Sequence, residues 1–341
     1  MSVTIKSIDR LGFPWETQDP FLFCAYHRDE YPAGTEEMSM PKKELEGRRI
    51  GQDFILKDGF RMYHGNHIPG FPYHPHRGFE TLTINKEGFV DHSDSLGAAG
   101  RFGKGDVQWM TAGKGVQHSE MFPMLNQNKP NPLEIFQVWL NLPAKSKLVD
   151  PHFTMLWKEN ITQVLDTDHE GKTSTIDVVA GHYKDANSPT PPPDSWAADP
   201  NNDVLILTIK INAGATLNID RATTKGVNRS LFYYKGDSIT IADQTIDFDH
   251  KINVDPEVDI EIKNGNEDSY LLLLQGKPIN EPIAKHGPFV MNTQEEIQNA
   301  FAEYRKTEFG GWPWPQREQV HGKEKGRFAL HADGREEVKE A

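Results

Sequence analysis

Residues 71–84 read FPYHPHRGFETLTI, and this stretch holds the two features from which the fold and the function are predicted. His74 and His76 are separated by one residue, and the run FETLTI that follows has an alternating pattern. Alternation with a period of two is typical of a β-strand with one buried face. Residues 85–88, NKEG, then give a turn signal before a return strand.

Strand-like runs of this kind recur along most of the chain. Turn residues separate them at intervals of about ten residues, which is typical of a β-sandwich or barrel. The runs form two strand-rich halves of about 130–150 residues each, so we expect two domains. Further runs occupy residues 107–110, 133–142, 176–181, 204–211, 230–234, 238–241, 258–262 and 269–274.

One helix is predicted near the C-terminal end of the sequence. Thr293 and Glu296 have the spacing of a capping box. Apolar residues follow at helical spacing, and two glycines give a stop signal at positions 310 and 311. We expect a helix over about residues 294–306. Beyond it we expect two docked tryptophans, Trp312 and Trp314, and then a mobile charged end, HADGREEVKEA.

The composition excludes several functional classes. The chain has 341 residues, with 37 Lys and Arg against 50 Asp and Glu, so its formal net charge is −13. An acidic protein lacks the basic surface that broad binding to DNA or RNA needs. No run approaches about 18 apolar residues, the N-terminus has no apolar signal-peptide core, and Cys24 has no second cysteine. We therefore expect a soluble cytoplasmic protein with no membrane and no direct nucleic acid partner.

Histidines concentrate in one part of the chain, since six of the fourteen fall between positions 64 and 118. This part contains the pair His74 and His76 and a second pair two residues apart, His118 and Glu120. Residues two apart on a strand point to the same side, so both members of a pair can reach one metal ion. The pairs are 42 positions apart, which leaves room for a hairpin and a returning strand. The sequence therefore predicts a metal site of three imidazoles and a carboxylate, with positions open for water or substrate.

A second carboxylate, Glu80, competes with Glu120 for the fourth position. It follows His76 by four residues, and we expect it on the same strand face, with Gly78 leaving space between them. Glu80 is therefore a candidate ligand, a candidate acceptor behind the ligands or a candidate proton-transfer group. Pro75 removes one ladder donor, so this strand should be irregular or lie at a barrel mouth.

Three other residues near the pairs have weaker assignments. Arg77 alternates away from the ligands, which favours a structural ion pair over substrate binding. His64 and His67 are candidates for the mouth of a pocket, with plain surface histidines as the alternative. No phosphate-binding loop, dinucleotide fingerprint or nucleophile elbow is present, so the sequence predicts no organic cofactor.

Several separated motifs, in order along the chain, closely resemble those of the pirins. They are FPYHPHRGFET at 71–81, GDVQWMTAGKGVQHSEM at 105–121, LNLP at 140–143 and GPFVMNT at 287–293. The resemblance implies an all-β fold of two tandem cupin (jelly-roll) barrels with a short C-terminal helix. The implied divisions are an N-terminal metal-binding barrel at 1–150, a degenerate barrel at 151–292, and a helix and tail at 293–341.

The resemblance also implies a ligand set and a metal. Carried over residue by residue, the ligands are His74, His76, His118 and Glu120, and the metal in pirins is usually iron. Three nitrogens and one oxygen also suit Mn, Ni, Co or Zn, so Fe²⁺ is an expectation from the family. In the wider cupin superfamily the carboxylate ligand lies at the place of Glu80. The second half has no pair of histidines two residues apart, in agreement with a metal-free second barrel.

Two functions are compatible with this resemblance. Some pirins cleave the flavonol quercetin with O₂, which predicts a dioxygenase for a phenolic substrate in which Glu120 or Glu80 takes the hydroxyl proton. Mammalian pirin-type proteins act as transcriptional co-regulators. The alternative is therefore a metal- and redox-responsive binding protein with a protein partner and no catalysis.

Overall fold

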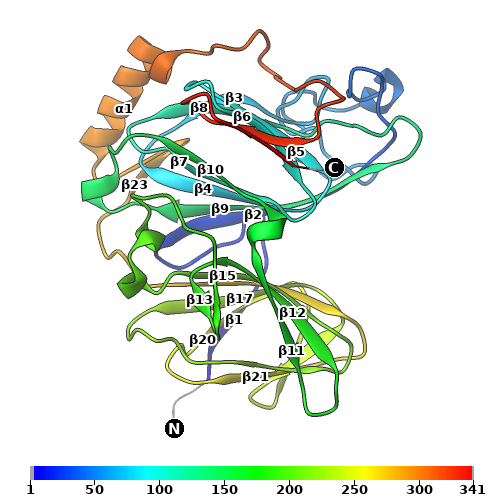
Figure 1. The fold of residues 1–341 in the computed structure, drawn as a ribbon, viewed down its shortest axis with the longest axis vertical. Helices are drawn as coiled ribbons and strands as arrows, with labels where there is room; N and C mark the ends of the chain where they lie inside the picture. Colours follow the sequence, from blue (N-terminus) through cyan, green and yellow to red (C-terminus); the bar gives the residue numbers. More distant parts are fainter. Residues whose placement is uncertain (1–3, 340–341) are drawn as a thin grey trace. The chain divides into compact units, whose positions relative to one another are not determined.

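The computed structural model describes residues 4–339 and shows an all-β chain with one α-helix in that range, near the C-terminal end (Figure 1). Two compact units are present. The histidine unit comprises residues 26–138, 143–158 and 281–339, and the leucine unit comprises residues 4–25, 139–142 and 159–280. The domain boundaries expected from the sequence, 1–150, 151–292 and 293–341, stay a prediction.

The histidine unit is built mainly from two antiparallel sheets. The six-stranded sheet has the order β26-β25-β6-β5-β8-β3, and the five-stranded sheet has the order β10-β7-β4-β9-β2. The first sheet contains β3 (Gly70–His76), β5 (Phe89–Asp94), β6 (Ala99–Gly103), β8 (Val116–Met121), β25 (Arg327–Leu330) and β26 (Glu336–Lys339). The second contains β2 (Phe21–Tyr31), β4 (Phe79–Glu87), β7 (Val107–Thr111), β9 (Asn131–Asn141) and β10 (His152–Leu156). A small hairpin joins β23 (Ala284–His286) to β24 (Phe289–Met291).

The two sheets of the histidine unit share one apolar core. Val90 and Phe102 of the six-stranded sheet cluster with Leu133, Ile135 and Met155 of the five-stranded sheet. The alternation in FETLTI predicts a strand with one buried face, but β4 is buried on both faces from Phe79 to its seventh residue. Its polar side chains are therefore in the interior, where each needs a hydrogen-bond partner.

The leucine unit has a seven-stranded sheet, a four-stranded sheet and a two-stranded ribbon. The seven-stranded sheet has the order β1-β20-β17-β22-β15-β12-β11 and the four-stranded sheet the order β16-β21-β18-β19. The first contains β1 (Ile5–Arg10), β11 (Thr162–Thr167), β12 (Thr173–Ala180), β15 (Leu205–Ile211), β17 (Asn228–Lys235), β20 (His250–Val254) and β22 (Ser269–Gly276). The second contains β16 (Thr216–Ile219), β18 (Ser238–Ile241), β19 (Gln244–Asp247) and β21 (Ile260–Asn264). The ribbon pairs β13 (His182–Tyr183) with β14 (Ala186–Asn187).

Large aliphatic side chains fill the core of the leucine unit. Leu207, Leu231 and Leu273 from the seven-stranded sheet pack with Leu217 and Ile262 from the four-stranded sheet, all fully buried. An interior of this kind is a packed core, as in small closed barrels. The expectation that this part of the chain binds no metal remains a prediction.

The helix expected from the capping box is α1 (Gln294–Thr307). The Thr293 side chain accepts from the backbone of Glu296, and the Glu296 side chain accepts from the backbone of Thr293, so the predicted box is confirmed. Short 3₁₀ turns occur at η1 (Lys42–Leu45), η2 (Ala144–Ser146), η3 (Lys158–Asn160), η4 (Trp196–Ala198), η5 (Pro200–Asn202) and η6 (Glu308–Gly310). Both tryptophans are docked as predicted: Trp314 Nε1 donates to the Asp94 carbonyl, and the Trp312 ring lies 5.0 Å from that of Tyr73.

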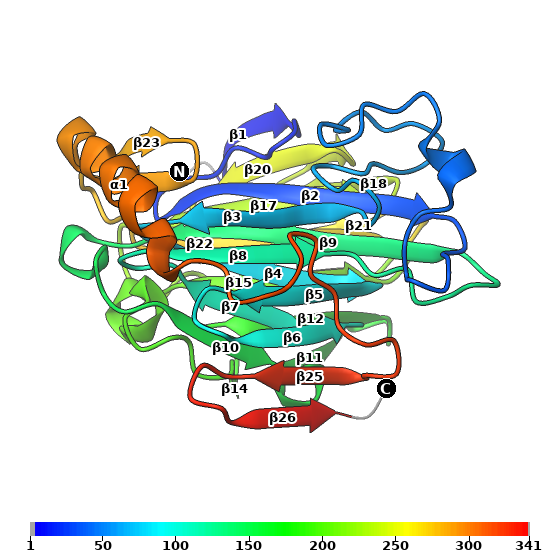
Figure 2. The same ribbon diagram turned by 90° about the horizontal axis from the view of Figure 1, so that it is seen from above.

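The expectation of a mobile charged end is wrong for the part of it that the structure describes. Strands β25 and β26 form a hairpin, and β25 pairs with β6 at the edge of the six-stranded sheet (red in Figure 2). Within residues 331–339, Glu337 accepts from Trp157 Nε1 at 2.8 Å and contacts His331 Nε2 at 2.7 Å. Strand pairing and these contacts hold a segment whose composition marks it as solvent-exposed.

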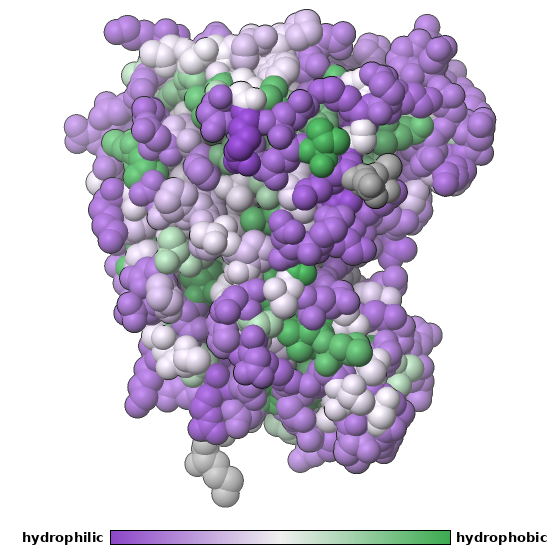
Figure 3. All heavy atoms as spheres, viewed as in Figure 1, coloured by the Kyte–Doolittle hydropathy of each residue, from purple (hydrophilic) through white to green (hydrophobic). Residues whose placement is uncertain are grey.

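The surface agrees with the polar composition of the chain. Hydrophilic side chains cover most of the face drawn in Figure 3, and hydrophobic residues appear there in smaller groups. Within residues 4–339, no helix combines the length and the hydropathy that spanning a membrane requires.

Candidate metal centre

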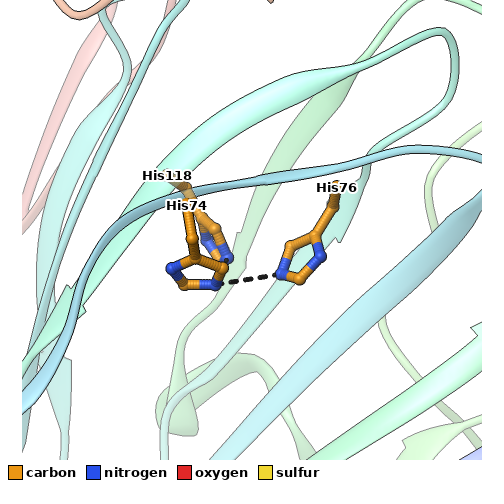
Figure 4. Close-up of side chains that lie close together, drawn as sticks. All are labelled: His74, His76 and His118. Carbon is orange, nitrogen blue, oxygen red and sulfur yellow. Dashed lines mark hydrogen bonds between the residues drawn. The ribbon is translucent and has the colours of Figure 1, made fainter. Parts of the chain in front are cut away.

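Three histidines of the histidine unit converge on one point (Figure 4). His74 Nε2 lies 3.1 Å from His76 Nε2 and 3.1 Å from His118 Nε2. His118 is fully buried, His76 is 3% exposed, and His74 is half-buried. Among residues 4–339, these three form the group of possible metal ligands whose donor atoms all lie within 4.8 Å of one another.

Strand pairing explains why the histidines meet. Strands β3 and β8 are antiparallel neighbours, and His74 lies directly opposite His118. The spacing of two residues puts His76 on the same face as His74. As Pro75 predicts, β3 is irregular: its register shifts between Phe71 and His74, and it is the edge strand of its sheet.

The other ring nitrogens determine which atoms face the shared point. Nδ1 of His74 lies 2.9 Å from the Pro72 carbonyl oxygen, and Nδ1 of His76 lies 3.4 Å from that of Pro288. A carbonyl oxygen only accepts, so in the neutral rings each Nδ1 carries the proton and each Nε2 presents a lone pair. Lone pairs at 3.1 Å repel each other unless a proton or a cation lies between the nitrogens.

The donor set fits a divalent metal ion. Nitrogen donors about 2.1 Å from one ion and about 90° apart lie about 3 Å from each other, close to the 3.1 Å separations in the structure. Histidines that bind metals usually donate their other N–H to a carbonyl or carboxylate, as His74 and His76 do. Burial lowers the pKa of His74 to about 4 and the pKa values of His76 and His118 well below their usual range. All three rings are therefore neutral at pH 7, the form that binds metals.

Glu120 lies beside the three histidines but outside the close group. Its Oε2 is 3.9 Å from His118 Nε2, and the residue is 4% exposed. Its two carboxylate oxygens contact Thr83 Oγ1 at 2.7 Å and Gln137 Nε2 at 2.9 Å. Burial raises the pKa of Glu120. Thr83 Oγ1 also lies 2.7 Å from Gln137 Oε1, so its single proton can be donated either to Glu120 or to Gln137.

Glu80 does not join the histidines. The expectation that it shares a strand face with His76 is wrong, because a turn at Arg77 and Gly78 separates β3 from β4, which lie in different sheets. Phe79 packs against the His76 ring and Thr83 reaches Glu120, so Glu80 lies on the opposite face of β4. There its Oε1 accepts from Thr111. The geometry favours Glu120 as the carboxylate of the site.

Two residues around Glu120 were not predicted from the sequence as part of the site. Thr83 is on β4 of the five-stranded sheet and Gln137 is on β9 of the same sheet, whereas Glu120 is on β8 of the other sheet. Both contacts therefore cross the interior between the sheets. The alternation in β4 could have pointed to Thr83, but no sequence signal relates Gln137 to Glu120.

The Thr83 hydroxyl should matter for metal affinity. Thr83→Val removes the group that contacts both Glu120 and Gln137, and loss of such an outer contact costs about 10- to 100-fold in metal affinity. We expect a loss of about 10-fold, measured by competition with a chromophoric chelator. Thr83→Ser keeps the hydroxyl and should bind within about 3-fold of the unmodified chain. Equal affinity in the valine and serine variants would mean that this hydroxyl does not support the site.

The other histidines of this region have different surroundings. His64 and His67 are exposed; His64 Nδ1 lies 2.8 Å from the Gly51 carbonyl, and the His64 ring is 5.9 Å from the Phe71 ring. His92 is fully buried, its ring lies 5.5 Å from that of His118, and its Nε2 contacts Asp94 at 3.2 Å. His92 is therefore a neighbour of the group and not a member of it.

Comparison with known proteins identifies the relatives of this chain. The family model for pirin matches residues 34–140, and the model for the pirin C-terminal cupin domain matches residues 206–310. Human pirin is 33% identical over 262 residues, which cover 75% of this chain and 82% of human pirin. The chain belongs to the pirin family. A pirin-like protein of Caulobacter vibrioides is also 33% identical, over 257 residues that cover 75% of this chain and 87% of that protein.

A solved structure extends the likeness to most of the chain. The crystal structure of a quercetin 2,3-dioxygenase from Acinetobacter baumannii matches with a TM-score of 0.68 and 28% identity. The match covers 91% of this chain and 97% of that one. The predicted fold class, two tandem cupin domains with a short C-terminal helix, is confirmed.

The pirin motif at residues 287–293 holds the turn that follows His76. The Arg77 amide donates to the Pro288 carbonyl, and the Val290 amide donates to the Arg77 carbonyl. Gly78 has a φ of +84°, and a Cβ on it would lie 2.0 Å from the Val290 carbonyl oxygen. Glycine is therefore required there both for the backbone conformation and for the close approach.

Proposed function

We propose that this protein is a metal-dependent dioxygenase that cleaves a quercetin-type flavonol or related phenol with O₂. The observation that carries the proposal is the convergence of three buried or half-buried imidazoles, with His74 Nε2 at 3.1 Å from the Nε2 atoms of His76 and His118, beside the carboxylate of Glu120. We propose His74, His76, His118 and Glu120 as the ligands. Fe²⁺ is the proposed metal, and Mn, Ni, Co and Zn suit the same donors.

A planar phenol can approach the site past aromatic side chains. His74 is the most exposed of the three histidines, so we propose that the substrate enters from its side. The Phe71 ring lies 6.2 Å from the His74 ring and 6.4 Å from the ring of Phe54, which is 38% exposed. These rings offer stacking contacts for a flat substrate with little loss of conformational entropy. We assign them the role of orienting the ring that carries the reacting hydroxyl.

Glu120 is the proposed proton acceptor. A buried carboxylate with a raised pKa is a stronger base than an exposed one, and its Oε2 is the oxygen nearest the histidines. It would take the proton of the substrate hydroxyl, while Thr83 and Gln137 hold its two oxygens in place. The metal, when bound, would stabilise the resulting substrate anion as a Lewis acid. Attack of O₂ on the activated ring carbon and loss of carbon monoxide complete the reaction in the family.

The named relative supports this assignment over a purely structural metal site. The Acinetobacter structure that covers 91% of this chain bears the name quercetin 2,3-dioxygenase. A structural site closes all its positions with protein ligands, whereas three histidines and one carboxylate leave positions open on a metal that prefers six ligands.

A second candidate function is metal-responsive binding of a protein partner without catalysis. The observation that favours it is the link from the site to an exposed helix: Arg77, next to His76, makes a 2.8 Å ion pair with Glu303 of α1, whose side chain is 53% exposed. A change at the site could reach the surface through this contact.

Oxygen uptake distinguishes the two functions. Iron-loaded protein should consume O₂ in the presence of quercetin and release carbon monoxide, measured with an oxygen electrode and by gas analysis. The control is His118→Ala treated in the same way, which should match the rate without protein. A fully metal-loaded chain that consumes no more O₂ than this variant, with quercetin or with simpler catechols, would contradict the dioxygenase assignment.

A further inference from the structure

We propose that the segment at the end of α1 and in η6, residues 303–311, positions the metal ligands by holding the residues next to two of them. We call this segment the C-terminal clamp. It contacts Gln117, which precedes His118, and Arg77, which follows His76. The inference rests on the proposed metal site, and it concerns residues that do not touch the metal or the substrate.

Gln117 makes three hydrogen bonds to the clamp. The Tyr304 hydroxyl donates to Gln117 Oε1 at 2.8 Å, and Gln117 Nε2 donates to the carbonyl oxygens of Glu308 at 2.7 Å and Gly311 at 3.1 Å. Gln117 is fully buried, and its amide is thereby satisfied on both sides. Neighbouring residues of a strand point to opposite faces. The clamp therefore contacts Gln117 on the outer face of β8, while His118 lies on the inner face.

Arg77 makes three contacts around the same segment. Its guanidinium forms a 2.8 Å ion pair with Glu303, lies 4.5 Å from the centre of the Phe309 ring, and donates from Nε to the Lys114 carbonyl at 2.6 Å. The Arg77 side chain is 5% exposed. An ion pair with one buried member and additional hydrogen bonds is held more firmly than one between two exposed side chains. The end of β3 and the start of β8 are therefore tied to one segment.

The close approach of the clamp to β8 is built into the backbone. Gly115, just before β8, has a φ of +132°, and a Cβ on it would lie 2.7 Å from the Phe309 ring. The ribbon views show the orange end of α1 beside β8 (Figures 1 and 2), in agreement with the printed hydrogen bonds. Phe309 packs in turn against Phe289 and Tyr304. The clamp is thus a packed element with its own small core.

This arrangement has an energetic consequence. Metal affinity depends on the separation of the donor atoms, and His76 and His118 come from two strands that the clamp holds in register. Residues that contact metal ligands directly typically contribute about 10- to 100-fold to metal affinity. The clamp contacts the chain neighbours of the ligands, so we expect its contribution to be smaller. We expect Tyr304→Phe to weaken metal binding about 3-fold and Glu303→Gln/Tyr304→Phe about 10-fold. By linkage, metal binding must stabilise the clamp to the same extent.

The test compares metal affinity with apo stability in matched variants of the full chain. Fe²⁺ and Co²⁺ dissociation constants are measured by chelator competition, and metal-free unfolding is measured with urea. The control is Tyr31→Phe, which removes another part-buried tyrosine hydroxyl in the same unit, one that donates to the Arg61 carbonyl at 2.9 Å. We expect the clamp variants to lose metal affinity, and Tyr31→Phe to keep it, at similar stability of the metal-free chains.

Hydrogen exchange supplies a readout that needs no substitution. Metal addition should slow amide exchange in residues 303–311 more than in the first two turns of α1. Unchanged affinity in Glu303→Gln/Tyr304→Phe, or an equal loss in Tyr31→Phe, would reduce the clamp to a purely structural element and overturn the inference. If the unmodified chain binds neither metal, the proposed metal site is wrong. This result differs from a chain that binds metal with an affinity that the clamp variants do not change.

Discussion

Replacement of His118 by alanine is expected to abolish metal binding while the chain stays folded. His118 is fully buried, and its Nε2 lies 3.1 Å from His74 Nε2, which lies 3.1 Å from His76 Nε2. Because loss of an outer contact already costs about 10- to 100-fold, loss of a ligand should lower metal affinity by more than about 100-fold. His74→Ala and His76→Ala should behave alike. Elemental analysis of protein purified without a metal-affinity tag measures the effect.

His92→Ala is the matched control for these variants. His92 is also fully buried and lies on the neighbouring strand, with its ring 5.5 Å from the His118 ring, but it is outside the converging group. It should retain metal to within about 10-fold, as expected for a residue behind the ligands. Full metal occupancy in any one of the three alanine variants would remove that histidine from the site.

Glu120→Gln should abolish dioxygenase activity, whereas Glu80→Gln should not. Glutamine has the shape of glutamate but cannot accept the substrate proton, and loss of a general base costs about 10²- to 10⁴-fold in rate. Glu120 is the carboxylate beside the histidines, at 3.9 Å from His118, and Glu80 lies on the opposite face of β4. We therefore expect weaker metal binding and an oxygen-uptake rate lowered at least about 100-fold for Glu120→Gln.

Comparison of Glu80→Gln with Glu120→Gln distinguishes the ligand set expected from the pirins, with Glu120, from the general cupin ligand set, with Glu80. Glu80→Gln should keep its metal and a rate within a few-fold of the unmodified chain, because Glu80 lies on the opposite face of β4, where its Oε1 accepts from Thr111. If Glu80→Gln loses the metal and Glu120→Gln keeps it, the ligand arrangement is the general cupin one. The assignment of Glu120 as a metal ligand, which follows from the resemblance to the pirins, would then be wrong.

The convergence of the histidines could be predicted from the sequence because it depends on local geometry. Side chains two residues apart share a strand face, so His74 and His76 had to point the same way once the segment was recognised as a strand. The pairing of β3 with β8 then put His118 opposite His74. The position of Glu80 could not be derived in this way, because it depends on a turn at Gly78 that moves the chain into another sheet.

Contacts between residues distant in the sequence carry the rest of the site and the fold. The contacts of Glu120 with Thr83 and Gln137 join two sheets, and those of Gln117 with the clamp join residues that are about 190 positions apart. Arg48 also shows the limit of composition. Charged residues are mostly exposed, yet the side chain of Arg48 is fully buried and makes a 3.0 Å ion pair with Asp53.

Anomalous diffraction from crystals of the iron-loaded protein tests the central claim most directly. The account predicts one peak per chain, within about 2.3 Å of the Nε2 atoms of His74, His76 and His118, with a Glu120 oxygen as the next protein ligand. A peak bound by Glu80 in place of Glu120, a second peak within the leucine unit, or iron bound away from these histidines would contradict it.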